Sequence, residues 1–253
     1  YPGTSNFFIS GFTTSSAPEV IFEENNIGEK AGNSDVLIIA FSNNRQLYML
    51  GAADQEIWYN AGAGLIPFAR QDGRFSQVGC VAPHSVVTLG ETFFWLGSNA
   101  QGGGIVYMLD NAFPTPVSTN AVSNAIQNYG SLSGATAWSY QQEGHYYYCL
   151  NIPGADTTWV YDMASKQWHE RQSTIDGITG RHLVQTHCVL NNMHIVGDYR
   201  NGNIYELDLN TYTDNGDMIL RIRQTPHVSE SLYRLFYKLK RNICSYSSKC
   251  SSI

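Results

Sequence analysis

The stretch "GNIYELDLNTYTDNG" (Gly202–Gly216) has three earlier counterparts in the same chain. In each of them, small or polar turn residues lead into β-branched or aromatic residues, then a Tyr, and then an Asp or Asn. The counterparts are "QEIWYNAGAG" (Gln55–Gly64), "GGGIVYMLDN" (Gly102–Asn111) and "TTWVYDMASKQW" (Thr157–Trp168). The chain therefore carries an internal repeat.

The repeat has a regular spacing and a common order of segments. Its tyrosines are Tyr59, Tyr107, Tyr161 and Tyr205, which are 48, 54 and 44 residues apart. Three acidic residues, Asp110, Asp162 and Asp208, follow them at similar places. Each Tyr segment is preceded by a strand-like run, such as "TFFWLGSN" or "HYYYCLN", and by a weaker run before that. Each unit thus has the order strand, turn, strand, turn, strand, with room for a fourth strand.

A period of this length built from short strands predicts a β-propeller. One small twisted sheet cannot cover both of its own faces, so it stacks against the next sheet. We expect an all-β propeller-type array of about four to six small antiparallel sheets over residues 1–237. Four units are visible, fewer than closed propellers commonly use, so the ring is expected to be incomplete or to close through other residues.

One segment departs from the all-β pattern. "VSTNAVSNAIQNYG" (Val117–Gly130) places its apolar residues on one helical face. Ser118 or Thr119 is positioned to cap the start, and Gly130 is a plausible stop. The sequence therefore predicts a short helix between two blades, with Ala121, Val122, Ala125 and Ile126 on its apolar face.

The composition agrees with short strands and tight turns. Charged residues make up 14% of the chain, which holds 16 Tyr, 11 Phe and 23 Gly. The longest strongly apolar run, Val36–Phe41, is far shorter than the ~20 residues of a membrane helix, so no membrane span is expected. The first residue is Tyr, and we expect the sequence to begin inside a longer product.

Cysteine usage and charge suggest further expectations. The five cysteines lack paired short spacing, so we expect buried free thiols at Cys80, Cys149 and Cys188 in a reducing compartment. Residues 1–217 hold 20 acidic and 8 basic side chains, a net charge of −12. Residues 218–253 hold 7 basic and 1 acidic side chain, a net charge of +6. This basic end could contact nucleic acid or an acidic partner surface, or it could be a solvated tail, and the solvated tail is favoured.

Three groups of residues could form chemical sites. Asp110, Asp162 and Asp208 could act as paired carboxylates, but equivalent positions on successive blades favour turn formation. The histidines of "RHLVQTHCVLNNMH" lack the close pairs of a zinc site. The triplet Gly102–Gly104 lacks the Lys-Ser/Thr of a phosphate loop and favours a hairpin. We therefore predict no catalytic, cofactor-binding or metal-binding residues.

Long segments of the chain resemble a known family, the packaged-DNA stabilisation proteins of short-tailed phages and related prophages. The resemblance covers residues 6–237. The segments that carry it are "EIWYNAGAGLIPFAR" (Glu56–Arg70), "GCVAPHSVV" (Gly79–Val87), "FFWLGSNAQGGGIVYMLD" (Phe93–Asp110), "VSTNAVSNAI" (Val117–Ile126), "AWSYQQEGHYYYCLNIPGADTTWVYDMASKQWHER" (Ala137–Arg171) and "GDYRNGNIYELDLNTYTDNG" (Gly197–Gly216).

The resemblance implies a tail hub or head-closure protein. Such a protein assembles below the portal after packaging, forms a homo-oligomeric ring and contacts other tail proteins, with packaged DNA nearby. It implies a virion protein that passes through the host cytoplasm during assembly, with no enzymatic activity. The sequence departs from the family at both ends. It lacks an N-terminal portion, and the atypical basic, Ser/Cys-rich tail 238–253 indicates a shifted frame or a degenerate end.

The competing hypothesis is a carbohydrate-binding or carbohydrate-active propeller. That hypothesis predicts aromatic side chains and carboxylates that converge on one central cleft. Loops on a rigid scaffold commonly carry recognition, so segments 151–158 and 200–203 are candidates for partner contact under either hypothesis.

Overall fold

The computed structural model describes residues 3–10, 22–30, 35–62, 66–99 and 102–222, and the short segments 242–243 and 251–252. The chain divides into two compact units, Tyr1–Leu220 and Arg221–Ile253. In the second unit, β22 (Asn242–Ile243) pairs antiparallel with β23 (Ser251–Ser252). Cys244, Cys250, His227 and most of the predicted basic tail lie outside the described residues.

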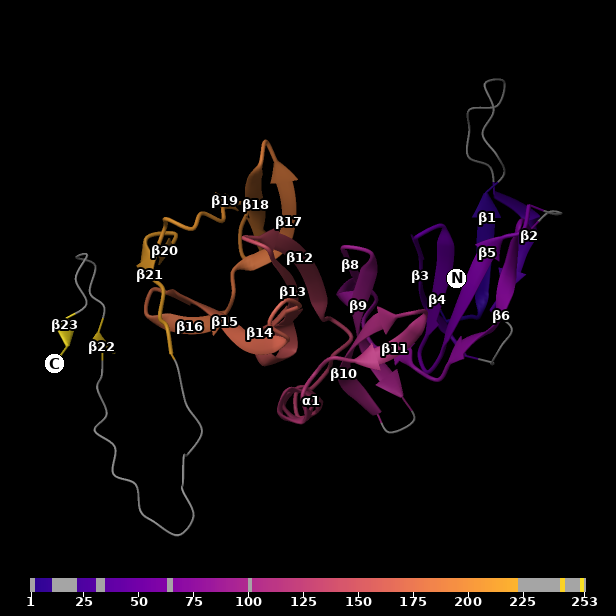
Figure 1. Cartoon of the computed structure of the whole chain (residues 1–253), viewed down its shortest axis with the longest axis horizontal. Coiled ribbons are helices and arrows are strands. Elements are labelled where there is room, and N and C mark those ends of the chain that lie inside the picture. The colour runs from indigo at the N-terminus through magenta and orange to yellow at the C-terminus, as the bar shows by residue number, and fades with distance from the viewer. Residues whose placement is uncertain are drawn as a thin grey trace, which may run out of the picture. The chain divides into compact units, whose positions relative to one another are not determined.

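In the described part of the first unit, four antiparallel sheets of three or more strands follow one another along the chain, and we call them blades 1 to 4 (Figure 1). Blade 1 consists of β3 (Leu37–Asn43), β4 (Gln46–Gly51), β5 (Gln55–Asn60) and β6 (Phe68–Ser76). Blade 2 consists of β7 (Gly79–Cys80), β8 (Val87–Leu89), β9 (Thr92–Asn99), β10 (Gly102–Asp110) and β11 (Phe113–Pro116). Blade 3 consists of β12 (Thr136–Gln142), β13 (His145–Ile152), β14 (Thr157–Asp162), β15 (Gln167–Ile175) and β16 (Ile178–Arg181). Blade 4 consists of β17 (Val184–Leu190), β18 (Met193–Asp198) and β19 (Ile204–Glu206).

Smaller elements complete the first unit. The pairs are β1 (Asn6–Ser10) with β2 (Phe22–Glu29) and β20 (Thr213–Asp214) with β21 (Asp217–Met218). One α-helix, α1 (Asn120–Gln127), and two 3-10 turns, Pro83–Ser85 and Pro153–Ala155, connect strands. The all-β propeller prediction, with one helix between blades, is confirmed.

Two-residue turns close the hairpins of the blades. Five of them place two consecutive residues at positive φ, as the tight twist of a type I′ turn requires. These turns are Asn44–Arg45, Asn111–Ala112, Glu143–Gly144, Asp176–Gly177 and Asn191–Asn192, with φ values between 48° and 81°. Asn and Gly tolerate this conformation better than most residues, which is why the sequence repeats them between strands.

Blades pack face to face through alternating side chains, because successive residues of a strand point to opposite faces. Between blades 1 and 2 the buried residues include Tyr48, Ile57, Phe93 and Trp95. Between blades 2 and 3 they include Phe94, Leu96, Tyr148, Leu150 and Tyr161. Between blades 3 and 4 they include Trp138, Tyr140, Val184 and Val196.

The described blades form an open series and not a closed ring. Blades 1 and 4 lie at its two ends (Figure 1). The free face of blade 1 is covered by β1 and β2, where the ring of Phe7 meets Trp58 edge to face at 5.4 Å. The free face of blade 4 leaves Leu190 and Ile204 57% and 71% exposed.

Helix α1 packs against blade 2 through a bulge in β10. The ladder between β9 and β10 shifts between Gly103 and Ile105. Gly104 has a φ of +97°, and a Cβ there would lie 3.0–3.3 Å from atoms of Gln127 and Ile126 in the helix. The glycine triplet, which the sequence favoured as a hairpin turn, is instead a segment of strand β10 that allows the close approach of α1.

Two further predictions, for Gly130 and Cys188, are wrong. Gly130 does not end α1, since the helix stops at Gln127 with Asn128 as its C-cap. Cys188 is not buried: it is an exposed free thiol on β17, whereas Cys80 and Cys149 are buried. Cys188 points to the free face of blade 4, which no other sheet covers in the described part of the chain.

The predicted cap of α1 is confirmed at Thr119, whose Oγ1 accepts a hydrogen bond from the Val122 N–H at 3.3 Å. Thr119→Ala removes this acceptor and is expected to lower the free energy of unfolding by about 1 kcal/mol, as for other N-cap losses. Urea unfolding followed by circular dichroism measures the change. Ser133→Ala, at an exposed hydroxyl bonded only to Ser131 in the described structure, is the control and should change stability by less than about 0.5 kcal/mol. Equal losses in both variants would contradict the cap assignment.

Candidate functional site

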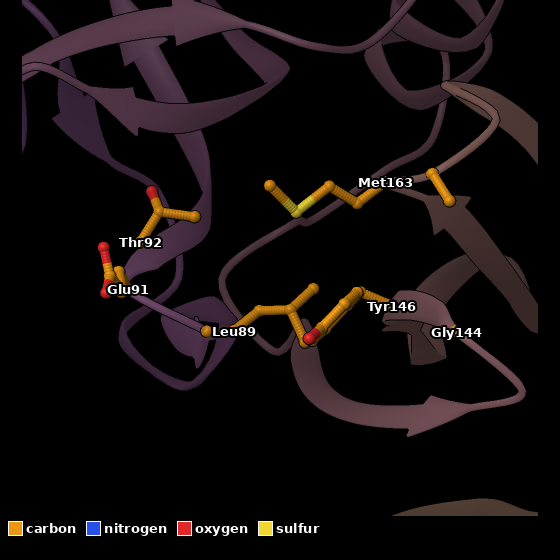
Figure 2. Close-up of a pocket in the computed structure, with 8 residues that line it drawn as sticks. Leu89, Glu91, Thr92, Gly144, Tyr146 and Met163 are labelled. Atoms are coloured by element: carbon orange, nitrogen blue, oxygen red, sulfur yellow. The ribbon is translucent and has the colours of Figure 1, made fainter.

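A groove of about 420 Å³ lies between blades 2 and 3, where hairpin turns of the two blades meet. Figure 2 shows Leu89, Glu91 and Thr92 on one side of it and Gly144, Tyr146 and Met163 on the other. Its lining residues are Leu89, Gly90, Glu91, Thr92, Gly144, Tyr146, Met163 and Ala164. We call this site the interblade groove.

The blade 2 wall is a tight turn that blade 1 holds in place. Leu89 pairs with Thr92, so Gly90 and Glu91 form a two-residue hairpin turn. Gly90 has a φ of +65°, a backbone conformation that would be strained in a residue with a side chain. The Glu91 carbonyl accepts hydrogen bonds from the side-chain amides of Asn43 and Asn44 at 3.2 and 2.9 Å. The turn is therefore fixed from outside its own blade.

The blade 3 wall is organised by Asp162. Its carboxylate accepts hydrogen bonds from the Ala164 N–H (3.0 Å), the Ser165 hydroxyl (2.6 Å) and His145 Nδ1 (2.8 Å). Partial burial alone would raise the pKa of Asp162, but these hydrogen bonds outweigh it and hold the pKa below its usual value. Asp162 stays ionised and fixes the turn that carries Met163 and Ala164.

One hydrogen bond joins blades 2 and 3 next to the groove, and another fixes the blade 3 wall. The Ser139 hydroxyl on β12 donates to the Thr88 carbonyl on β8 at 3.0 Å. The Met163 N–H donates to the Tyr146 carbonyl at 2.9 Å. Leu89 is buried, while Tyr146 and Met163 are half-buried. Most of the accessible lining is apolar, and Glu91 is the lining residue with a formal charge.

Each repeat tyrosine lies on the last of three consecutive strands of its blade. These strands are β5, β10, β14 and β19, for blades 1 to 4 in turn. Tyr107, Tyr161 and Tyr205 pair with Trp95, Tyr148 and Val196, each the fourth residue of its partner strand. Tyr59 differs, because it pairs with Gln46 at the start of β4 and is 45% exposed.

The repeat aspartates lie at or after the ends of these strands. Asp110 ends β10, where its Oδ1 accepts a hydrogen bond from Asn111 at 3.0 Å. Asp208 follows β19 and accepts hydrogen bonds from the Asn210 N–H and the Thr211 hydroxyl at 3.1 and 2.9 Å. These bonds to the turn lower the pKa of Asp208. The structure does not bring the three carboxylates together, since each serves a turn of its own blade.

A second polar cluster lies between blades 3 and 4, and sequence reasoning missed its geometry. His187 and His194, on paired strands, approach ring nitrogen to ring nitrogen at 3.0 Å. His187 also contacts the ring of Trp138, and His182 stacks on the same ring at 6.3 Å. The Arg171 guanidinium donates to the Tyr140 hydroxyl at 2.5 Å nearby.

Burial and nearby charge lower the pKa of His182 and of His187. Burial first, and then the positive charge of Arg171, lower the pKa of His182 to about 3. Burial and His194 lower the pKa of His187. Within the described part of the chain no group of three His, Cys, Asp or Glu side chains is placed to hold a metal ion. The cluster is therefore a packed interface between blades.

Comparison with known proteins decides the family. The family model described as "Bacteriophage P22 Gp10, beta-propeller" matches residues 10–212, which is most of the chain. The chain belongs to this family. A comparison with curated proteins gives no match. The resemblance inferred from the sequence is thereby confirmed, and this member of the P22 Gp10 family is a phage structural protein of the virion with a β-propeller fold.

Membership in this family also bears on the predicted absence of enzymatic activity. A structural phage family supports the prediction that the chain is not an enzyme. Among the described residues no helix is long and apolar enough to cross a membrane. The interblade groove was not expected from the sequence, which had favoured segments 151–158 and 200–203 for partner contact. Its local signals are Gly90 and Gly144 in turns of neighbouring blades, but nothing in the sequence places those turns together.

Proposed function

We propose that the protein closes the portal channel after DNA packaging, retains the packaged DNA and docks further tail components. The family match over residues 10–212 supports this role most directly. In this proposal the protein acts as a homo-oligomeric ring at the head–tail junction, assembled from subunits in the host cytoplasm. Symmetric repetition of one contact makes a stable closure from modest contacts per subunit.

The charge balance is compatible with a ring around DNA. Residues 1–217 carry a net charge of −12, so an acidic lumen is expected to repel the phosphate backbone and let DNA slide. Non-specific proximity to DNA is part of this proposal. The carbohydrate alternative predicted carboxylates converging on one cleft, whereas Asp162 and Asp208 are engaged in turns of different blades.

The proposal is tested by assembly on portal rings. Purified chain is mixed with portal protein encoded beside it in the same phage genome, and negative-stain images and sedimentation are recorded. We expect a shift of the portal peak and added density on the channel axis. Portal rings that lack their tail-facing segments are the control, and their sedimentation peak should not shift. Glycan binding or hydrolysis without any assembly on portal would contradict the proposal and support the carbohydrate alternative.

A further inference from the structure

The interblade groove has room for a bulky side chain. Its volume of about 420 Å³ is at the low end of ligand pockets, which span roughly 300–1,000 Å³. Leu89, Tyr146 and Met163 supply its apolar surface. Figure 2 shows Met163 extending toward the blade 2 wall and Tyr146 extending toward Leu89. An apolar side chain inserted here would remove these groups from water.

The groove is also rigid, so an inserted side chain would lose little free energy to reordering of the walls. Asn43 and Asn44 hold the Glu91 turn, and Asp162 holds the Met163 turn. A preorganised site avoids much of the ordering cost of binding. These bonds come from three blades, which indicates that the groove persists as long as the blades stay stacked.

The charge at the rim selects the chemistry of the occupant. Glu91 is exposed, and its carboxylate forms no hydrogen bond or ion pair with the described residues. It lies beside a surface that is otherwise apolar or uncharged. A cation next to an apolar group would satisfy both features, whereas an acidic segment would meet repulsion.

We propose that the interblade groove docks a partner tail protein by taking one large apolar side chain of an extended segment, with a Lys or Arg beside it paired to Glu91. The inference rests on the proposed function, because it gives the chemistry of a docking contact. The partner segment needs no defined secondary structure, because one apolar side chain and one cationic side chain make the contact.

The direct test uses small probes that reproduce these two features. The chain holds five methionines, and methyl-¹³C labelling with the Met163→Leu variant identifies the Met163 signal. Tryptamine supplies an aromatic group with a cation, and indole-3-propionate supplies a similar aromatic group with an anion. We expect tryptamine to shift the Met163 signal with an affinity about three- to tenfold higher than indole-3-propionate at low salt. Glu91→Gln should reduce this preference to less than about twofold.

Variants establish the location of binding. Ala164→Trp places a large side chain at the exposed rim of the groove and should abolish the Met163 shift. Ile178→Trp, on an exposed position of the same blade, is the matched control and should leave the shift unchanged. Absence of a shift in the native chain, equal affinity for the two probes, or binding that survives Ala164→Trp would each overturn the inference.

The assembly assay separates this inference from the proposed function. If the native chain joins portal rings and Ala164→Trp and Glu91→Lys still recruit the next tail protein as well as Ile178→Trp does, the groove inference is wrong and the proposed function stands. If the native chain fails to join portal rings, the proposed function is wrong whatever the probes do. If Ala164→Trp instead abolishes self-association of the chain alone in sedimentation, the occupant is a second copy and the inference is also wrong.

Discussion

Trp95→Ala is expected to lower the free energy of unfolding by about 3–5 kcal/mol, the range for deleting a large buried aromatic side chain. Trp95 is fully buried on β9 between blades 1 and 2. Its ring lies 5.1 Å from Phe93 and 5.7 Å from Tyr107, and its Nε1 donates to the Gly79 carbonyl at 3.1 Å. The substitution therefore leaves a cavity and removes one hydrogen bond to the Gly79 carbonyl.

Urea unfolding followed by circular dichroism and by intrinsic fluorescence measures this loss. Trp95→Phe is the matched control, because it keeps an aromatic ring in the same place and removes only part of the volume and the N–H donor. The control should lose clearly less stability than Trp95→Ala. A loss below about 1.5 kcal/mol for Trp95→Ala would mean that blades 1 and 2 are not stacked through this residue.

Lowering the pH from 7 to 4 is expected to destabilise the chain, with a contribution from His182 on the order of 3 kcal/mol. The folded-state pKa of His182 is about 3, below its ordinary value of 6.5. Between these two values the unfolded chain binds a proton that the folded chain does not. The stability is thus fully present above pH 6.5 and is lost as the pH falls from there toward 3. His187 acts in the same direction, since its pKa is also lowered.

The free energy of unfolding measured against pH checks this expectation. His182→Asn removes the titrating ring and should flatten the acid limb of the curve, even if the variant is less stable at pH 7. His84→Asn, at an exposed histidine far along the chain from the cluster, should keep the slope of the native protein. Parallel curves for the native chain and His182→Asn would show that acid lability arises elsewhere.

The sequence was sufficient to predict the blades because each blade is specified locally. Runs such as "TFFWLGSN" alternate between two buried faces, and pairs such as Asn191–Asn192 fit tight hairpin turns, so strands and turns follow from short segments. The Thr119 cap was predictable for the same reason, since it depends on residues three positions apart.

Features that depend on contacts between distant residues were not predictable. Cys188 sits in a strand-like run, but its exposure depends on whether another sheet covers blade 4. The contact between His187 and His194 depends on the register of β17 and β18. The interblade groove brings Gly90 and Met163 together across two blades, a distance of many residues along the chain. Only the stacking of the sheets decides these three arrangements.

The two ends of the blade series differ, and local opening should follow that difference. Separation of blade 2 or blade 3 from its neighbours breaks two stacked interfaces. Separation of blade 1 breaks one interface with blade 2 and its contact with β1 and β2. Blade 4 loses a single blade-to-blade interface, the one around Trp138 and Tyr140. Fluctuations that expose backbone amides therefore begin at blade 4 and travel toward blade 1, so the molecule unravels in one direction.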